Sequence, residues 1–97
     1  MAKQEARIAW AEVFSALGSE PRLRIVELLA GGKVQCQDIL GQLDLSQPAV
    51  SYHLSKMERA GVLRKERVGT RNCYRLTKEL EGLLRSVIRE DGSWTTL

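Results

Sequence analysis

A mainly α-helical domain with one β-hairpin is the fold that this sequence predicts, on three observations. Apolar residues recur at helical spacing in five segments of the 97-residue chain. Two of those segments, 35–43 and 46–60, are separated only by Asp44 and Leu45. Two short segments with alternating apolar and polar residues, 62–67 and 72–76, follow them. The order α-α-α-α-β-β-α, with a tight turn between the third and fourth helices, predicts a winged helix-turn-helix.

Length and composition indicate a single domain over residues 1–97. Hydrophobic residues make up 43% of the chain and charged residues 28%, which is ordinary for a folded protein. No apolar run approaches the roughly 18–20 residues that a membrane helix needs. The first residues also lack the layout of a signal peptide, so we expect a cytoplasmic protein.

Catalytic and metal-binding residue types are scarce. Two cysteines and one histidine are too few for a four-ligand Cys/His zinc site within one chain. Paired carboxylates and a phosphate-binding glycine loop are not visible either. We therefore expect no catalytic residues, no metal and no cofactor, and an enzyme is disfavoured. His53 falls between Val50 and Met57, where a core histidine bonded to the backbone is favoured over a ligand or a base.

Glycines and capping residues predict where the helices begin and end. An amphipathic helix over 5–17 ends at Gly18, and a buried second helix begins at 19–21 (SEP) and ends at the glycine pair 31–32. Ser46 is expected to cap the fourth helix, and Thr77 a last helix over 77–90. A polar tail at 91–97 follows, whose order the sequence does not determine.

Positive charge is concentrated in one third of the chain. Residues 46–76 contain seven Lys and Arg but only two acids, a net charge of +5, whereas the whole chain carries +3. Basic charge gathered in this way indicates a polyanionic partner.

The outer face of helix 46–60 carries short polar side chains early and cations late. A helix in the major groove of DNA reads base edges chiefly from its N-terminal part, so we expect Gln47, Ser51 and Tyr52 to read bases. An exposed polar face is common among helices, but the basic hairpin beside this one favours double-stranded DNA. The predicted DNA-binding residues are Ser46, Gln47, Ser51, Tyr52, Ser55, Lys56, Arg59, Arg64, Lys65, Arg67 and Arg71.

Three blocks carry a family resemblance: 14–25 (FSALGSEPRLRI), 45–54 (LSQPAVSYHL), and the pair 60–63 (AGVL) and 74–76 (YRL). In this order they resemble the opening signature, the recognition helix, and the helix exit with second wing strand of the arsenical-resistance-repressor (ArsR/SmtB) family. The resemblance implies a homodimeric winged-helix repressor. Such a repressor binds a pseudo-palindromic operator and releases it when an inducer binds.

The metal-binding positions of that family are not matched. Where arsenic- and cadmium-type members have Cys-x-Cys-Asp, this chain has 35–38 (QCQD), so both ligand positions are glutamine. Lys78 and Leu80 stand where zinc-type members are expected to have ligands. The inducer is left open between thiol oxidation, an atypical metal or small ligand at a dimer interface, and no inducer at all.

The two cysteines, Cys36 and Cys73, are the candidates for a redox switch. We expect Cys36 to share a helix face with Ile39, which favours a small buried apolar residue over a thiol sensor. Strand alternation places Cys73 between Arg71 and Arg75 on the outer face, where two guanidiniums favour the thiolate. A half-exposed, tolerated thiol is the simpler interpretation of Cys73. Control of DNA binding by its oxidation is the sharper one.

The terminal helices, about 5–17 and 77–90, offer more apolar surface than a small monomer easily covers. We expect part of it to pack in the core and part to form a homodimer interface. The predicted interface residues are Trp10, Phe14, Leu80, Leu83, Leu84, Val87 and Ile88.

These observations predict a sequence-specific, DNA-binding transcriptional regulator, a homodimeric repressor that uses helix 46–60 and wing 62–76. The alternative is a winged-helix module that binds protein without specific DNA binding, because one fold serves several functions. The +5 charge of residues 46–76 argues against that alternative.

Overall fold

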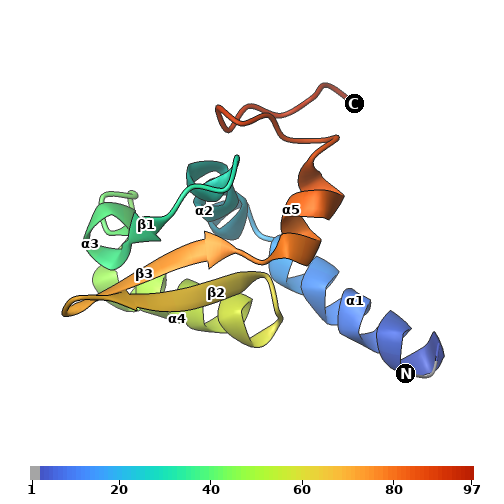
Figure 1. Cartoon of the computed structure of the whole chain (residues 1–97), viewed down its shortest axis with the longest axis horizontal. Coiled ribbons are helices and arrows are strands. Elements are labelled where there is room, and N and C mark those ends of the chain that lie inside the picture. The colour runs from blue at the N-terminus through green and yellow to red at the C-terminus, as the bar shows by residue number, and fades with distance from the viewer. Residues whose placement is uncertain (1–2) are drawn as a thin grey trace.

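The structure, a computed structural model, describes residues 3–97 and confirms the winged helix-turn-helix fold (Figure 1). The elements in chain order are α1 (Lys3–Leu17), α2 (Glu20–Leu29), β1 (Gln35–Cys36), α3 (Gln37–Leu40), α4 (Gln47–Arg59), β2 (Leu63–Val68), β3 (Arg71–Leu76) and α5 (Lys78–Leu84). The helix-turn-helix unit is α3 and α4, and the wing is the β2–β3 hairpin. No helix within residues 3–97 is long and apolar enough to cross a lipid bilayer.

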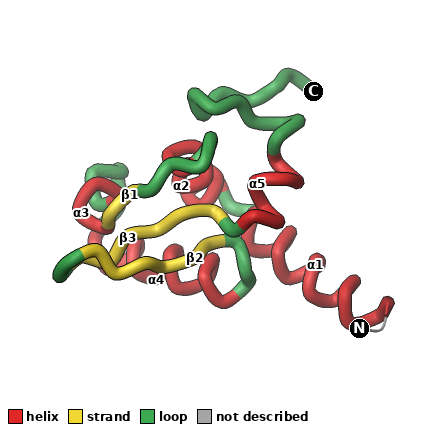
Figure 2. The backbone as a smooth tube through the Cα atoms, viewed as in Figure 1, coloured by secondary structure: helices red, strands yellow, loops and turns green. Residues whose placement is uncertain are grey.

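The wing is part of a three-stranded antiparallel sheet in the order β1-β3-β2 (Figure 2). β3 is the central strand and pairs with β2 along its whole length. Gly69 and Thr70 join the two strands, and Gly69 has φ 64°, as the first residue of such a two-residue turn requires. On its other edge β3 pairs with β1, which places Cys36 opposite Cys73.

A single hydrophobic core lies around α2, as predicted. Ile25, Val26 and Leu29 of this helix are completely buried. The other elements contribute Val13, Ala16, Leu40, Val50, Leu54, Met57, Val62, Leu63, Tyr74, Leu76, Leu80, Leu84 and Ile88. The core therefore holds the helix-turn-helix unit and the wing against one central helix.

Arg22 is a charged residue buried within this core, with 9% of its surface exposed. Its Nε donates to the carbonyl oxygen of Ala16 in α1, and its Nη1 donates to Nδ1 of His53 in α4 at 3.1 Å. Burial, together with the positive charge of Arg22, lowers the pKa of His53. His53 is thus a half-buried acceptor at the margin of the core, and its partner is an arginine side chain and not the backbone.

The predicted helix over 35–43 is wrong at both ends. Gln35 and Cys36 form β1, and α3 covers only Gln37–Leu40 before the chain turns through residues 41–45. Cys36 therefore precedes α3 instead of sharing a helical face with Ile39, which is 40% exposed. The free edge of β3 explains the difference, because pairing with it satisfies the backbone at residues 35 and 36.

The last helix is also shorter than the predicted range 77–90. α5 ends at Leu84, and the chain folds back so that Ile88 and Trp94 form an antiparallel bridge. Gly92 makes this return possible, since its φ is 86° and a Cβ there would lie 2.9 Å from the carbonyl oxygen of Glu27. Gly92 thus lies beside Glu27 near the end of α2.

Burial divides the predicted interface residues into two groups. The first group, which belongs to the core of the chain, is Leu80, Leu84 and Ile88. The second group, exposed at 55%, 39% and 37%, is Phe14, Leu83 and Val87. Trp10 is partly buried, and its ring centroid lies 6.0 Å from that of Phe14. The residues of the first group pack within the chain and are therefore not available to a partner. The exposed residues and Trp10 remain predicted interface residues.

Replacing Arg22 by alanine is expected to lower the free energy of unfolding by about 2–4 kcal/mol, because the buried carbonyl of Ala16 and the half-buried ring of His53 lose their donor. Denaturant unfolding measures this change. Arg24→Ala in the same helix is the matched control, since the Arg24 side chain has no hydrogen bond or ion pair within residues 3–97. It is expected to change stability by less than about 0.5 kcal/mol. Equal losses in both variants would contradict the role given to Arg22.

Stability is also expected to depend on the protonation of His53, the single histidine of the chain. Because the pKa of His53 is lowered on folding, the unfolded chain takes up this proton first as pH falls below about 6.5. The free energy of unfolding should therefore be highest above that pH, where His53 is neutral in both states, and should decrease as the pH falls toward 5. Denaturant unfolding at a series of pH values measures the slope, which His53→Gln should abolish. A variant that retains the slope would assign it to another group.

Candidate nucleic-acid interface

The fourth helix, α4, begins at the predicted cap and turns the predicted apolar side toward the core. Ser46 is its N-cap, and the Ser46 Oγ accepts a hydrogen bond from the backbone N–H of Ala49 at 3.2 Å. Pro48 lies in the first turn, where no backbone donor is needed. The residues that face the core are Val50, Leu54 and Met57. The residues that face solvent are Gln47, Ser51, Tyr52, Ser55 and Arg59, with Lys56 half-buried.

Two of the predicted base-reading residues touch α3. The Gln37 Nε2 donates to the Ser51 Oγ at 3.2 Å. The side-chain amide nitrogen of Gln47 lies so close to Gly41 that any Cβ at position 41 would overlap it. Because Gln37 occupies an acceptor site of the Ser51 hydroxyl, that hydroxyl keeps its own hydrogen for another acceptor. α3 therefore orients the polar N-terminal face of α4.

Gln37 and Gly41 are not among the residues that the sequence predicts to bind DNA. Gln37 is noted there only as one of the glutamines at the ligand positions of metal-binding relatives, and neither residue carries a charge. Each acts through its contact with α4. The glycine directly after α3 is the one sequence feature that could have indicated a close contact at this point. A glycine is equally common at an ordinary helix end, so it does not identify such a contact.

The wing presents cations beside this face. Arg64, Lys65 and Arg67 of β2 are exposed, as is Arg71 at the start of β3. In Figure 1 the hairpin turn and the N-terminal part of α4 lie at the same end of the molecule. The Arg67 Nη1 donates to the Asn72 Oδ1 across the hairpin at 3.5 Å.

Arg71 is already paired in the free chain. Its guanidinium forms an ion pair with Asp38 of α3. Hydrogen bonding to Arg71 lowers the pKa of Asp38, and the same bond raises the pKa of Arg71. Arg75 is similarly paired with Glu66, at 3.1 Å within the hairpin. Arg71 therefore links the wing to α3 through this ion pair, in addition to adding positive charge.

Lys56 and Arg59 lie at the other end of α4. With Glu12 and Ser15 of α1 they line a shallow cavity of about 210 Å³ between the two helices. The end of α4 that carries them is thus separated from the hairpin turn of the wing by the length of α4 (Figure 1).

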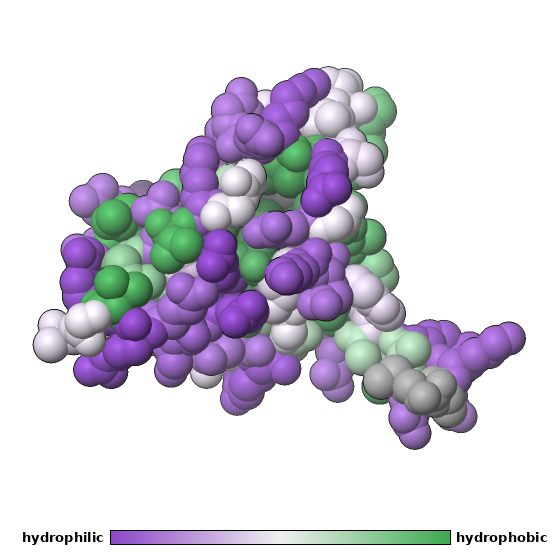
Figure 3. Space-filling view, viewed as in Figure 1, coloured by the Kyte–Doolittle hydropathy of each residue, from purple (hydrophilic) through white to green (hydrophobic). Residues whose placement is uncertain are grey.

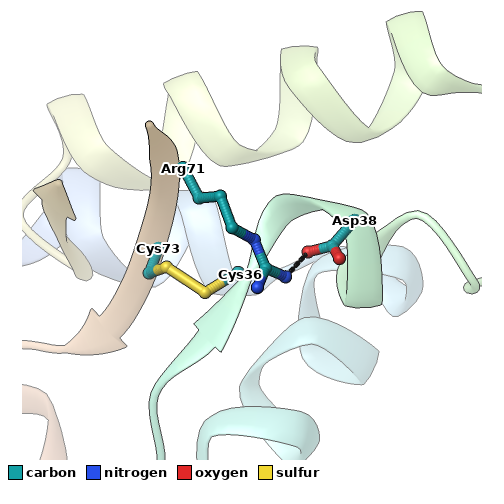
Figure 4. A network of polar contacts seen from close by, with 4 residues as sticks. All are labelled: Cys36, Asp38, Arg71 and Cys73. Atoms are coloured by element: carbon teal, nitrogen blue, oxygen red, sulfur yellow. Dashed lines mark hydrogen bonds and ion pairs between the residues drawn. A yellow bond between two sulfur atoms is a disulfide. The ribbon is translucent and has the colours of Figure 1, made fainter. Parts of the chain in front are cut away.

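The two cysteines form a disulfide between β1 and β3 (Figure 4). Cys73 has no exposed surface, so the prediction of a half-exposed thiol beside two arginines is wrong. Its side chain is covered because β3 is the central strand and Cys36 of β1 lies directly opposite. Cys36 is partly buried.

Hydrophobic side chains gather on the surface near this disulfide. Figure 3 shows a mostly hydrophilic face with a green group over β1, α3 and the turn of the wing. The exposed apolar residues there are Val34, Ile39 and Val68, at 41%, 40% and 54% exposure. In residues 3–97 no three His, Cys, Asp or Glu side chains are grouped so as to hold a metal ion.

Comparison of the sequence with known proteins finds transcriptional regulators. Residues 19–65 match the family model described as bacterial regulatory protein, arsR family. The arsenic resistance transcriptional regulator ArsR1 of Pseudomonas putida is 32% identical over 87 residues, which cover 84% of this chain and 68% of that protein.

Solved structures agree with the fold. The transcriptional repressor PagR of Bacillus anthracis superposes with a TM-score of 0.75 at 30% identity, over 86% of this chain and 97% of PagR. The winged helix-turn-helix DNA-binding domain of Mb0332 from Mycobacterium bovis, described as homodimeric, has a TM-score of 0.74 at 25% identity. That match covers 86% of this chain and 80% of the Mb0332 chain.

Proposed function

This chain belongs to the arsR family of DNA-binding transcriptional regulators, and we propose that it is a homodimeric repressor that reads its operator with the N-terminal part of α4. The observation that carries the proposal is the polar face of α4, held by α3 and flanked by the basic wing. Such a helix fits the major groove, where base edges present donors and acceptors.

The side chains on that face suit base recognition. Ser51, which accepts from Gln37, donates its own hydrogen to an acceptor such as a purine N7. The Gln47 amide offers both a donor and an acceptor, and the exposed Tyr52 ring supplies an apolar contact for a thymine methyl group. Ser46 and Ser55, at the two margins of this face, bind the sugar-phosphate backbone of the DNA.

The cations position the protein without reading sequence. Arg64, Lys65 and Arg67 contact the phosphates or the minor groove beside the wing, and Arg71 joins them when DNA competes with Asp38. Lys56 and Arg59 contact phosphates at the far end of α4. This arrangement supports DNA as the partner over a protein-binding module, since the charge surrounds a helix of groove size.

A dimer supplies the second half of the contact. One recognition helix buries too little surface for a specific operator, and two helices placed about 34 Å apart enter successive major grooves. Such a dimer covers exposed apolar residues of the terminal segments, among them Phe14 with its neighbour Trp10, Leu83 and Val87. The homodimeric state described for Mb0332 supports this assembly.

The inducer is not the metal of the arsenic- and zinc-type relatives in this proposal. The glutamines at 35 and 37, and the lack of a metal-binding cluster within residues 3–97, do not fit such an ion. A repressor acts where the chromosome is, so we assign it to the cytoplasm.

Selection from a pool of random DNA duplexes tests the function. The purified protein should enrich a pseudo-palindrome whose half-sites lie about one helical turn apart. If the dimer neutralises about eight phosphates, the affinity should fall about 10³- to 10⁵-fold between about 50 and 200 mM salt. A salt-independent affinity, or no enriched sequence, would contradict the proposal.

Separate roles are expected for Gln47 and Arg67. Gln47→Ala should weaken binding to the enriched duplex by about 5- to 150-fold while leaving binding to unrelated DNA nearly unchanged. Arg67→Ala should weaken both by a similar factor, because phosphates are present in every sequence. Fluorescence anisotropy with both duplexes measures the four values. Equal losses of specific and non-specific binding from Gln47→Ala would remove Gln47 from base reading.

Gly41→Ala tests whether α3 orients Gln47. The added methyl group displaces the Gln47 amide, the end of a flexible side chain, so stability should change by less than about 0.5 kcal/mol. Specific affinity should nevertheless fall about as far as in Gln47→Ala. In a Gln47→Ala background the same substitution should add nothing. Additive losses in the double variant would show that Gly41 acts by another route.

A further inference from the structure

We propose that Cys36 and Cys73 form a reversible thiol–disulfide site, and that the disulfide raises the affinity for DNA by holding the wing to the helix-turn-helix unit. The inference rests on the proposed function, since it concerns the regulation of the same DNA-binding surface. The chemical partners of the site are dithiol reductants and hydroperoxides.

The position of the disulfide connects the two parts that DNA must engage together. Cys36 is the residue directly before α3, and Cys73 lies in the middle of β3, with a Cα–Cα distance of 3.8 Å. The crosslink spans 37 residues of sequence, which include all of α3, α4 and β2. It therefore closes the segment that carries both the recognition helix and the first strand of the wing.

The core holds the base of the wing, but few interactions other than the disulfide join β3 to the start of α3. β1 has only two residues, so its ladder with β3 is short. The Arg71–Asp38 ion pair joins the same two parts, but both side chains are more than half exposed, and water and salt weaken such a pair (Figure 4). The disulfide is the covalent member of this junction, so its loss is expected to loosen the wing.

Burial determines which sulfur reacts. Cys73 has no exposed surface, whereas Cys36 is only partly buried. A reductant thiolate therefore attacks the Sγ of Cys36, forms a mixed disulfide there and releases Cys73 as a thiolate that takes up a proton. The second thiolate of the reductant then attacks its own sulfur in the mixed disulfide. Cys36 leaves and is protonated, and the reductant becomes a disulfide.

Reoxidation runs through the same residue. The Cys36 thiolate attacks a hydroperoxide, which leaves as an alcohol and converts Cys36 to a sulfenic acid. The Cys73 sulfur then displaces the hydroxyl group of the sulfenic acid as water and restores the disulfide. Two electrons pass from the two thiols to the peroxide. In the cytoplasm, to which we assign this repressor, cellular reductants keep thiols reduced. A disulfide in such a compartment serves redox sensing and not permanent crosslinking.

The direction of control follows from preorganisation. Two parts that are already fixed relative to one another lose less conformational freedom when they bind DNA. The disulfide form is therefore the tighter binder, and reduction is expected to weaken binding about 3- to 10-fold for each protomer.

The test compares the oxidised and the reduced full-length protein on the duplex enriched from the random pool, by fluorescence anisotropy. In parallel, the thiol state is followed by alkylation and mass spectrometry across a series of dithiol reductant concentrations. We expect two thiols to appear together and the affinity to fall over the same range. The reduced protein treated with a hydroperoxide should regain both the disulfide and the affinity.

Single and double variants provide the controls. Cys73→Ala should leave a thiol at Cys36 that a small disulfide reagent modifies readily, whereas Cys36→Ala should leave a buried, slowly reacting thiol at Cys73. Cys36→Ala/Cys73→Ala should bind like the reduced protein and ignore the reductant. Reduced wild-type protein alkylated at Cys36 serves as a second measurement if that variant does not fold.

The outcomes separate the two proposals. Equal affinity of both redox forms, or tighter binding by the reduced form, would overturn the regulatory role and leave the repressor function intact. Absence of specific binding in both forms would overturn the repressor function and, with it, the regulation. Thiols that never appear under reductant would show a permanent structural crosslink.

Discussion

The arrangement of the helices depends on the hydrogen bonds of one buried guanidinium. Arg22 of α2 donates to the end of α1 and to His53 of α4, so three helices meet at a single side chain. A lysine has no such fixed fork of donors and does not satisfy two acceptors in different directions equally well. Because α4 carries the polar face that we assign to DNA, the core contact of Arg22 also sets the position of the recognition helix relative to α1.

The surface that we assign to DNA is organised by the neighbours of its polar side chains. Ser51 and Gln47 are positioned by Gln37 and Gly41 of the preceding helix and turn. Asp38 of the same short helix pairs with Arg71 of the wing. α3 thus contacts both the reading helix and the wing, although it is only four residues long. In the proposed function α3 orients these groups and makes no base contact of its own.

The sheet explains why the cysteines behave differently from the expectation. A hairpin taken alone has one face inward and one outward, which placed Cys73 beside Arg71 and Arg75. The third strand changes this environment, because β1 pairs with the free edge of β3 and brings Cys36 opposite Cys73. The same junction joins the wing to α3, and for this reason we propose that its redox state bears on DNA binding.

Much of the local structure of this protein follows from short-range sequence signals. Caps, prolines and apolar periodicity predicted α4 almost to the residue, and alternation predicted the wing, because these signals depend on nearby residues only. Polar residues opposite the buried set of α4 likewise identified the candidate reading face. Only the tertiary structure decided that Gln35 and Cys36 extend into a strand and that α5 ends at Leu84. It also decided that Arg22 bonds to His53 and that the cysteines meet. These features depend on contacts between residues that are far apart in the sequence. The spacing of residues along the chain does not indicate which distant side chain or strand edge a residue will contact.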